Sequence, residues 1–217
     1  RMDTSKLKEY ILKHNIENSL IPPALLNSNE LLPLKLIMIA GEVFDQTVLD
    51  FYMKNGAKVL NLYGNTEAVM LAYKLNKSSK ATSRNIGVHL NNVRCFVLNS
   101  DNKIVPVNVV GELCVGGIGV SRGYLNMAEK TREVFIRNPY QSDKEKEMNI
   151  NGRLYKTGDL VKWLPNGEIE YVGRKDFQVK IKGMRIELLE IQKCLSLYEG
   201  IDKCVVAVKE SKLGNKY

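Results

Sequence analysis

The segment from residue 153 to residue 187 places a carboxylate and several cations near one another in the sequence. The pair Gly158–Asp159 lies between two strand-like runs, and an Asn-Gly pair at 166–167 predicts a tight turn. A strand is expected over 177–181, where apolar and polar residues alternate and Lys180 is one of the polar residues. A carboxylate fixed at a strand end suits a diol, and cations suit phosphates. These residues therefore favour a nucleotide as the ligand.

A second candidate site lies at 61–67, which reads NLYGNTE, where a short apolar strand ends in a glycine-containing turn. On a functional interpretation, Tyr63 packs on a base, Thr66 contacts a phosphate oxygen and Glu67 binds Mg²⁺ through its carboxylate. The alternative is a plain helix start in which Asn65 or Thr66 caps the first turn. The motif alone leaves both interpretations open.

Glycines recur through residues 111–123, which read GELCVGGIGVSRG. A phosphate-binding loop would need a strand, a GxxxxGK sequence and a helix, and this segment has no such arrangement. We therefore assign these glycines a structural role in tight packing or turns. The Thr-Gly-Asp sequence at 157–159 could by itself be only a turn as well.

The composition is that of an ordinary globular protein, since 44% of the 217 residues are hydrophobic and 26% are charged. This length suffices for one large domain or for one and a half small ones. We find no run of about 18 apolar residues and no signal-peptide pattern at 1–10, and we expect no membrane partner. The four cysteines lack a CxxC spacing, which favours small core residues in a reducing, cytoplasmic compartment over a metal site or disulfides.

Histidines and basic residues narrow the chemistry further. His14 and His89 are the only histidines, and His14 continues a helical pattern, so a catalytic histidine is not expected. The net charge of +8 would suit phosphates or an acidic partner, although lysines that merely solvate the surface explain it equally well. Basic residues are not interleaved with aromatic ones, and we expect no nucleic-acid partner.

The first half of the chain predicts an α/β arrangement. Apolar strands are expected at 36–40 and 58–62, with an amphipathic helix at 45–54 between them. A strand, a helix and a strand at this spacing predict a parallel pair with a crossover, whose ligand edge lies at the carboxyl ends of the strands. Gly41 and Tyr63 both follow those ends.

The pattern changes to period two after about residue 84, which predicts a β-rich second half. The further elements expected are strands at 93–98 and 112–115, a helix at 127–136, a mobile polar loop at 141–151, a helix at 187–198 and a strand at 203–209. A small unit begins after Asp176. One helix and two short strands would give that unit only a thin core.

In this order, the motifs resemble the adenylation domains of non-ribosomal peptide synthetases, within the adenylate-forming ligases. The resemblance runs from about Leu34 onward and rests on NLYGNTE (61–67), GELCVGGIGVSRGYL (111–125), YKTGDL (155–160) and GRKDFQVKIKGMRIELLEI (173–191). It implies a partial α/β adenylate-forming fold: a parallel β/α segment, a β-rich distorted barrel, and the start of a small α+β C-terminal subdomain. Residues 1–175 would belong to the large core and residues 176–217 to the small subdomain.

The resemblance also implies an activity. Such domains activate an amino acid with ATP and Mg²⁺ to an aminoacyl-adenylate and release pyrophosphate. They then transfer the acyl group to the phosphopantetheine thiol of a carrier domain. Positioning and cations assist such a reaction more than a protein nucleophile does, so the lack of a catalytic histidine is no objection.

Each matching position acquires an expected role. Tyr63 would stack on adenine beside Gly41, Thr66 would contact a phosphate, and Glu67 would bind Mg²⁺. The remaining expected residues are Asp159 for the ribose hydroxyls, Tyr171 and Arg174 at the nucleotide site, Asp176 at the hinge of the small subdomain, and Lys180 and the Gly183 loop in the thiolation state.

The amino-acid pocket would draw on apolar positions, namely Met38, Ala40, Leu62, Met70 and Leu71. Their character predicts an apolar or aromatic substrate, although several of them could instead be core residues beneath the strand ends. The residue that binds the substrate ammonium would lie upstream of Arg1.

The sequence also departs from the family pattern. Asn65 stands where proline is usual, and asparagine tolerates turn conformations well. A phosphate loop of the STGTTGKPK type is absent, and the catalytic lysine of the adenylation step would lie beyond Tyr217. We therefore expect a fragment without a catalytic residue of its own, which makes adenylate at a negligible rate alone. Its helix at 7–14 should have either an exposed face or a partner.

Two other functions stay open at this point. One is a related ligase, such as an aryl-acid ligase, a D-alanine carrier-protein ligase or an acyl-CoA synthetase. An aspartate in the upstream pocket would indicate an α-amino acid, and its absence an acyl or aryl acid. The other is a non-catalytic binding or scaffold module that keeps the fold, against which weak binding of Mg²⁺-ATP would argue.

Overall fold

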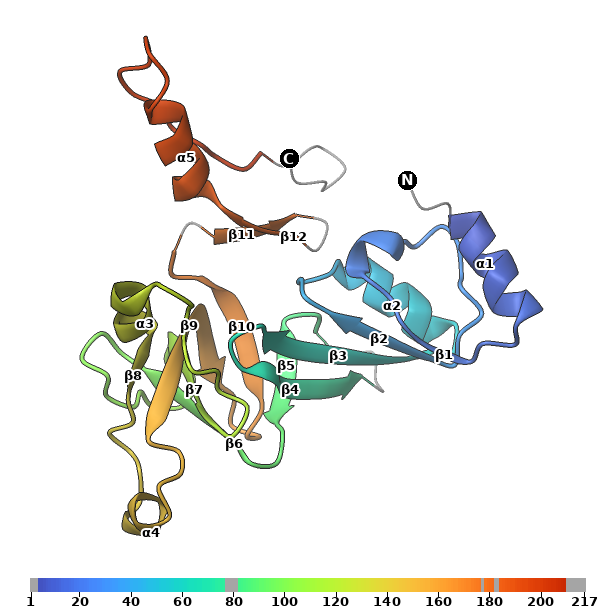
Figure 1. The fold of residues 1–217 in the computed structure, drawn as a ribbon. Helices are drawn as coiled ribbons and strands as arrows, with labels where there is room; N and C mark the ends of the chain where they lie inside the picture. Colours follow the sequence, from blue (N-terminus) through green and yellow to red (C-terminus); the bar gives the residue numbers. More distant parts are fainter. Residues whose placement is uncertain (1–3, 77–81, 177, 182–183, 210–217) are drawn as a thin grey trace.

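A ten-stranded sheet runs through the part of the chain that this computed structural model describes, residues 4–76, 82–176, 178–181 and 184–209 (Figure 1). The helices are α1 (Thr4–Lys13), the 3-10 turn η1 (Pro23–Leu25), α2 (Gln46–Lys54), α3 (Ala128–Val134), α4 (Asp143–Glu147) and α5 (Leu188–Ser196). The strands are β1 (Asn18–Leu20), β2 (Leu36–Ala40), β3 (Lys58–Asn65), β4 (Val69–Asn76), β5 (Asn85–His89), β6 (Val93–Leu98), β7 (Gly111–Gly117), β8 (Phe135–Arg137), β9 (Arg153–Trp163), β10 (Ile169–Arg174), β11 (Gln178–Ile181) and β12 (Met184–Glu187).

The large sheet is mixed. Its order is β1-β2-β3-β4-β5-β10-β9-β7-β6, with β8 beside β9. The pairs β1–β2 and β2–β3 are parallel, and the pairs from β3–β4 onward are antiparallel. The predicted strand–helix–strand unit is confirmed by β2, α2 and β3, and the first of these strands has the expected bounds.

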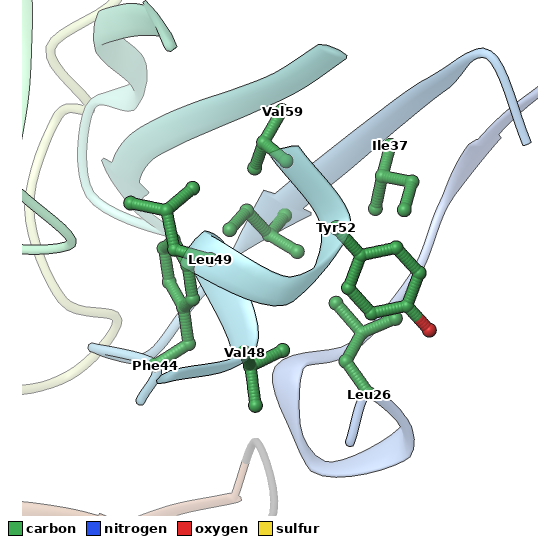
Figure 2. A pocket seen from close by; sticks show the side chains of 8 residues that line it. Leu26, Ile37, Phe44, Val48, Leu49, Tyr52 and Val59 are labelled. Carbon is green, nitrogen blue, oxygen red and sulfur yellow. The ribbon is translucent and has the colours of Figure 1, made fainter. Parts of the chain in front are cut away.

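Helix α2 packs its apolar side on β2 and β3. The helix begins after Asp45, whose side chain accepts a hydrogen bond of 2.8 Å from the backbone N–H of Thr47. Ile37, Tyr52 and Val59 are almost fully buried at this interface, and Figure 2 shows their side chains gathered around the helix. The packing leaves no space for a water molecule. This cluster therefore anchors the strands whose ends carry the candidate site.

The helix start considered at Asn65 or Thr66 is wrong, because β3 and β4 form a hairpin there. The Asn65 side chain does accept a bond of 3.0 Å from the backbone N–H of Ala68, as a cap would. The chain then reverses at Val69, which has a left-handed φ of 58°, and pairs back along β3. Strand β4 was not expected from the sequence.

Other expectations need smaller corrections. The polar loop at 141–151 contains α4, whose start is closed by reciprocal bonds between Ser142 and Glu145. The expected helix at 127–136 ends at Val134, where β8 begins. Burial raises the pKa of the Cys95 and Cys114 thiols to about 12, which agrees with the expected core position of the cysteines. Cys194 is exposed, so the expectation is wrong for that residue.

The hairpin β11–β12 and helix α5 stand together on one side of the large sheet (Figure 1). Strand β11 confirms the expected strand at 178–181, whereas Phe177 lies outside the described residues. Helix α5 lies where it was expected and buries none of its residues. Residues 203–209 are not a strand, because the described chain offers them no neighbour to pair with. Among the helices of the described ranges, none has the length and apolar character to cross a membrane.

The two halves of the large sheet meet at β5, and Glu168 ties this junction together. Its carboxylate forms an ion pair with Lys74 of β4 and accepts a bond of 2.7 Å from the Asn85 side chain of β5. Burial alone would raise the pKa of Glu168, but these partners lower it overall. The carboxylate therefore stabilises the fold at neutral pH, and this contribution disappears as the pH falls through the lowered pKa.

We expect Glu168→Gln to lower the free energy of unfolding by about 1–3 kcal/mol at pH 7, because the partly exposed Lys74 and the buried Asn85 lose their charge-assisted bonds. The deficit should shrink as the pH falls below the usual glutamate pKa of 4.5. Urea unfolding followed by circular dichroism measures both effects. Glu133→Gln, in the exposed pair with Lys130, is the control and should change stability by less than about 0.5 kcal/mol. Equal effects of the two substitutions would contradict the assignment.

Candidate functional site

An open pocket of about 540 Å³ lies at the carboxyl ends of β2 and β3. Because these strands are parallel, their ends meet at one edge of the sheet. The pocket is lined by Ala40, Gly41, Leu62, Tyr63, Gly64, Asn65, Thr66 and Val69. Five residues singled out from the sequence are therefore neighbours: two assigned to the amino acid and three to the nucleotide.

The other expected pocket residues are less well placed by the structure. Met38 is half-buried on the same face of β2 as Ala40, but it is not among the residues that line this pocket. Met70 and Leu71 belong to β4, and their side chains lie outside the described part of the structure.

Asp159 lies in β9, and its buried carboxylate is held from two sides. The Tyr63 hydroxyl donates a hydrogen bond to Oδ2, and Arg174 Nη1 donates one of 2.9 Å to Oδ1. Burial, followed by the nearby charge of Asp159, raises the pKa of Tyr63 well above its usual value, so the hydroxyl keeps its proton. Since a carboxylate offers about four lone-pair positions, two remain for a ligand.

Arg174 joins this carboxylate to the residues beyond β10. Its guanidinium also donates to the carbonyl oxygen of Thr157 at 2.7 Å and to both carboxylate oxygens of Asp176, at 2.9 and 2.5 Å. Gly158 leaves room for this arrangement, because a Cβ there would stand 2.7 Å from Arg174 Nη2, and its φ is +72°. The expected carboxylate at a strand end or turn is therefore wrong: Gly158 and Asp159 lie inside β9, where the pairing with β7 is irregular, and this packing fixes the carboxylate.

Glu67 is the second buried carboxylate of the site, 4% exposed, just after the end of β3. Its Oε1 accepts hydrogen bonds from the Tyr124 hydroxyl at 2.6 Å and from Arg185 Nη1 at 2.8 Å. Its Oε2 is buried without a hydrogen-bond partner. Burial alone would raise the pKa of Glu67, but the bonds from Tyr124 and Arg185 lower it below its usual value.

The donor set at Glu67 fits a weakly held divalent cation. An unpartnered buried carboxylate oxygen is a suitable ligand for Mg²⁺, which usually takes one or two protein carboxylates and completes its shell with phosphates and water. Across the described residues, no group of three or more histidine, cysteine, aspartate or glutamate side chains could hold a metal by itself. A cation here would therefore depend on ligands from a bound nucleotide.

Two further expected residues lie near Asp159. Burial lowers the pKa of Lys180, against an opposing effect of Asp159, and the charges of Arg174 and Arg185 also act on this lysine. Burial and then Asp159 raise the pKa of Tyr171 to about 12. Gly183 lies outside the described residues.

The sequence did not identify three residues that hold the site together. Tyr124 and Arg185 donate to Glu67, while Glu112 accepts from the backbone N–H of Gly158 at 3.2 Å and from Lys175 Nζ at 3.1 Å. All three occur within motifs quoted above. Local spacing carries no signal for contacts between residues so far apart in the chain.

A family model and two relatives with known names match this chain. A family model described as AMP-binding enzyme matches residues 4–125, more than half of the chain. The N-(5-amino-5-carboxypentanoyl)-L-cysteinyl-D-valine synthase of Penicillium chrysogenum is 41% identical over 99% of this chain. Bacitracin synthase 1 of Bacillus licheniformis is 38% identical over 100% of it. This chain spans only 6% and 4% of those two proteins, respectively.

Solved structures share the fold. An NRPS protein containing adenylation and PCP domains, bound to a vinylsulfonamide inhibitor, matches with a TM-score of 0.86 and 22% identity, over 99% of this chain and 38% of that chain. An artificially fused adenylation–PCP di-domain from Klebsiella oxytoca matches with a TM-score of 0.80 and 24% identity, over 97% and 40%. The chain therefore belongs to the AMP-binding enzyme family. Within that family, its sequence is of the adenylation-domain type found in non-ribosomal peptide synthetases.

Proposed function

We propose that this chain is the nucleotide-binding part of an adenylation domain that activates an amino acid with ATP and Mg²⁺. The complete protein would form an aminoacyl-adenylate, release pyrophosphate, and pass the acyl group to the phosphopantetheine thiol of a carrier domain. The observation that carries this proposal is the carboxylate of Asp159, fixed by Tyr63 and Arg174 beside the pocket at the ends of β2 and β3.

The proposed nucleotide contacts follow from this geometry. Asp159 keeps two lone-pair positions for the ribose hydroxyls. Tyr63 packs against the core and also lines the pocket beside Gly41, where its ring would stack on the adenine. Thr66 is exposed at the pocket and would contact a phosphate, with Tyr171 and Arg174 near the ribose. Mg²⁺ held by Glu67 would neutralise phosphate charge.

The amino acid would occupy the apolar side of the same pocket, near Ala40 and Leu62. This lining supports an apolar or aromatic side chain, with Met38, Met70 and Leu71 as the further positions to test. We also propose that the distorted barrel of the large core ends at residue 175. Asp176 would be the hinge of a small subdomain, which would bring Lys180 and the Gly183 loop to the site for thiolation.

Amino-acid-dependent exchange of pyrophosphate into ATP tests the proposal. The complete protein that contains this chain should exchange pyrophosphate in the presence of one or a few apolar or aromatic amino acids. The 217-residue chain alone should show a negligible rate, since the phosphate loop of the family is not part of its sequence.

Contrary results are easy to recognise. Exchange that requires an aryl or fatty acid and ignores all amino acids would assign the protein to another ligase class. Failure to bind Mg²⁺-ATP or to exchange pyrophosphate with any acid would favour a scaffold role. Exchange at ordinary enzyme rates by the isolated chain would refute the expectation that it is inactive alone.

A further inference from the structure

The cation that faces Glu67 in this structure is a guanidinium. Arg185 Nη1 lies 2.8 Å from Glu67 Oε1, although the two residues are 118 positions apart in the chain. Glu67 is 4% exposed, so its charge requires a partner within the protein or the ligand. Tyr124 donates to the same oxygen, but a neutral hydroxyl cannot balance the charge.

Arg185 belongs to the unit that stands apart from the large sheet. It lies on β12, the strand that pairs with β11 in the separate two-stranded sheet. Its other acidic partner is Glu187, at 3.4 Å on the same strand. The pair between Arg185 and Glu187 therefore does not connect the hairpin to the large sheet. The pair with Glu67 is therefore an ionic tie from the β11–β12 hairpin to the edge of the large sheet.

A divalent cation and Arg185 would compete for this carboxylate. If Mg²⁺ bound the unpartnered Oε2 while Arg185 stayed on Oε1, two cationic groups would stand within about 5 Å of each other, where like charges repel strongly. Lys180 is a further cation close enough to Arg185 for their charges to interact, whereas Arg174 is balanced by Asp159 and Asp176. The single charge of Glu67 cannot balance both Arg185 and a divalent cation.

We propose that Arg185 and a bound divalent cation occupy Glu67 in turn, so that Arg185 is the positioning residue that holds the β11–β12 unit on the core when the cation has left. This inference rests on the proposed function, because it takes Glu67 to be the Mg²⁺ ligand. By linkage, whatever favours the cation at Glu67 must release the β11–β12 unit to the same extent.

Hydrogen exchange of the complete protein, measured by mass spectrometry on peptides from β11 and β12, tests the tie without relying on activity. In the wild type, Mg²⁺ with a non-hydrolysable ATP analogue should speed this exchange, whereas the analogue with EDTA should not. Arg185→Gln should exchange rapidly under all conditions. It should also lower the Mg²⁺ concentration that half-saturates analogue binding in calorimetry by roughly fivefold or more.

Two variants serve as controls. Arg94→Gln removes the exposed arginine of the pair with Glu145, away from the site, and should behave as the wild type. Arg185→Lys keeps the charge and should restore part of the protection. Circular dichroism shows whether each variant remains folded.

The outcomes separate this inference from the proposed function. If the β11 and β12 peptides of Arg185→Gln exchanged as slowly as those of the wild type, the pair with Glu67 would not hold the hairpin on the core. That result would overturn this inference and leave the proposed function intact. Glu67→Gln should expose the hairpin as Arg185→Gln does and should also raise the Mg²⁺ requirement. An unchanged Mg²⁺ requirement in Glu67→Gln would show that Glu67 is not the metal ligand; it would overturn this inference and the metal assignment, but not the nucleotide site at Asp159.

Discussion

Gly87→Ala is expected to destabilise the fold by about 3–5 kcal/mol, since the new methyl group combines overpacking with a strained backbone. Gly87 lies in β5 with φ of +80°, and a Cβ there would stand 1.8 Å from the carbonyl oxygen of Tyr73 and 2.8 Å from Cα of Lys74. These are backbone atoms and cannot rotate away. Because β5 joins β4 to β10, the clash would part the two halves of the large sheet.

Gly56→Ala is the matched control for this experiment. Gly56 has nearly the same φ, +84°, but nothing lies within 4 Å of a Cβ at that position. Its substitution should therefore cost only the backbone strain, about 1–2 kcal/mol. Urea unfolding of both variants gives the comparison, and equal losses would show that the close approach at β5 is not real.

Asp159→Asn is expected to reduce kcat/KM for ATP by about 100-fold or more. The reason is that two ribose hydroxyls would each lose a hydrogen bond to a charged acceptor, worth about 1.5–3 kcal/mol apiece. The amide keeps the shape of the side chain, but it cannot balance Arg174, which lies 2.9 Å from Oδ1. Initial rates of amino-acid-dependent pyrophosphate exchange at varied ATP measure the loss.

Two further variants define the cause of that loss. Tyr63→Phe keeps the ring but leaves Oδ2 of Asp159 without its donor, so we expect a smaller reduction, of roughly tenfold. Asp101→Asn alters an exposed turn away from the site and should change nothing. An Asp159→Asn protein with wild-type kcat/KM for ATP would exclude the ribose assignment.

The β2–α2–β3 unit could be predicted because its signals are local. Strand β2 is a continuous apolar run, and α2 begins at a capping aspartate and ends at Asn55 and Gly56. Strand β4 could not be predicted in this way, because its place depends on pairing with β3 on one side and β5 on the other. The opposite error at 203–209 has the same cause: a strand-like sequence forms a strand only where a partner strand is present.

Several residues that the sequence singled out do lie together, but the bonds between them could not be predicted. Tyr63 and Asp159 were expected to meet through one ligand, and the structure shows that they also contact each other across 96 positions of sequence. The bond from Arg185 to Glu67 depends on how the β11–β12 hairpin sits on the core, which no spacing along the chain encodes. Residue types suggested the chemistry, while tertiary structure determined the partners.

The guanidinium of Arg174 forms ion pairs with two carboxylates: Asp159 on the large sheet and Asp176 just past β10. Turning the chain at Asp176 would break the paired bonds to that residue and leave the whole positive charge to Asp159. The orientation of the distal hairpin would thereby change the electrostatic potential at the proposed nucleotide pocket. Mechanical motion and ligand affinity would be coupled here through a single side chain, with no need for α5 to touch the ligand.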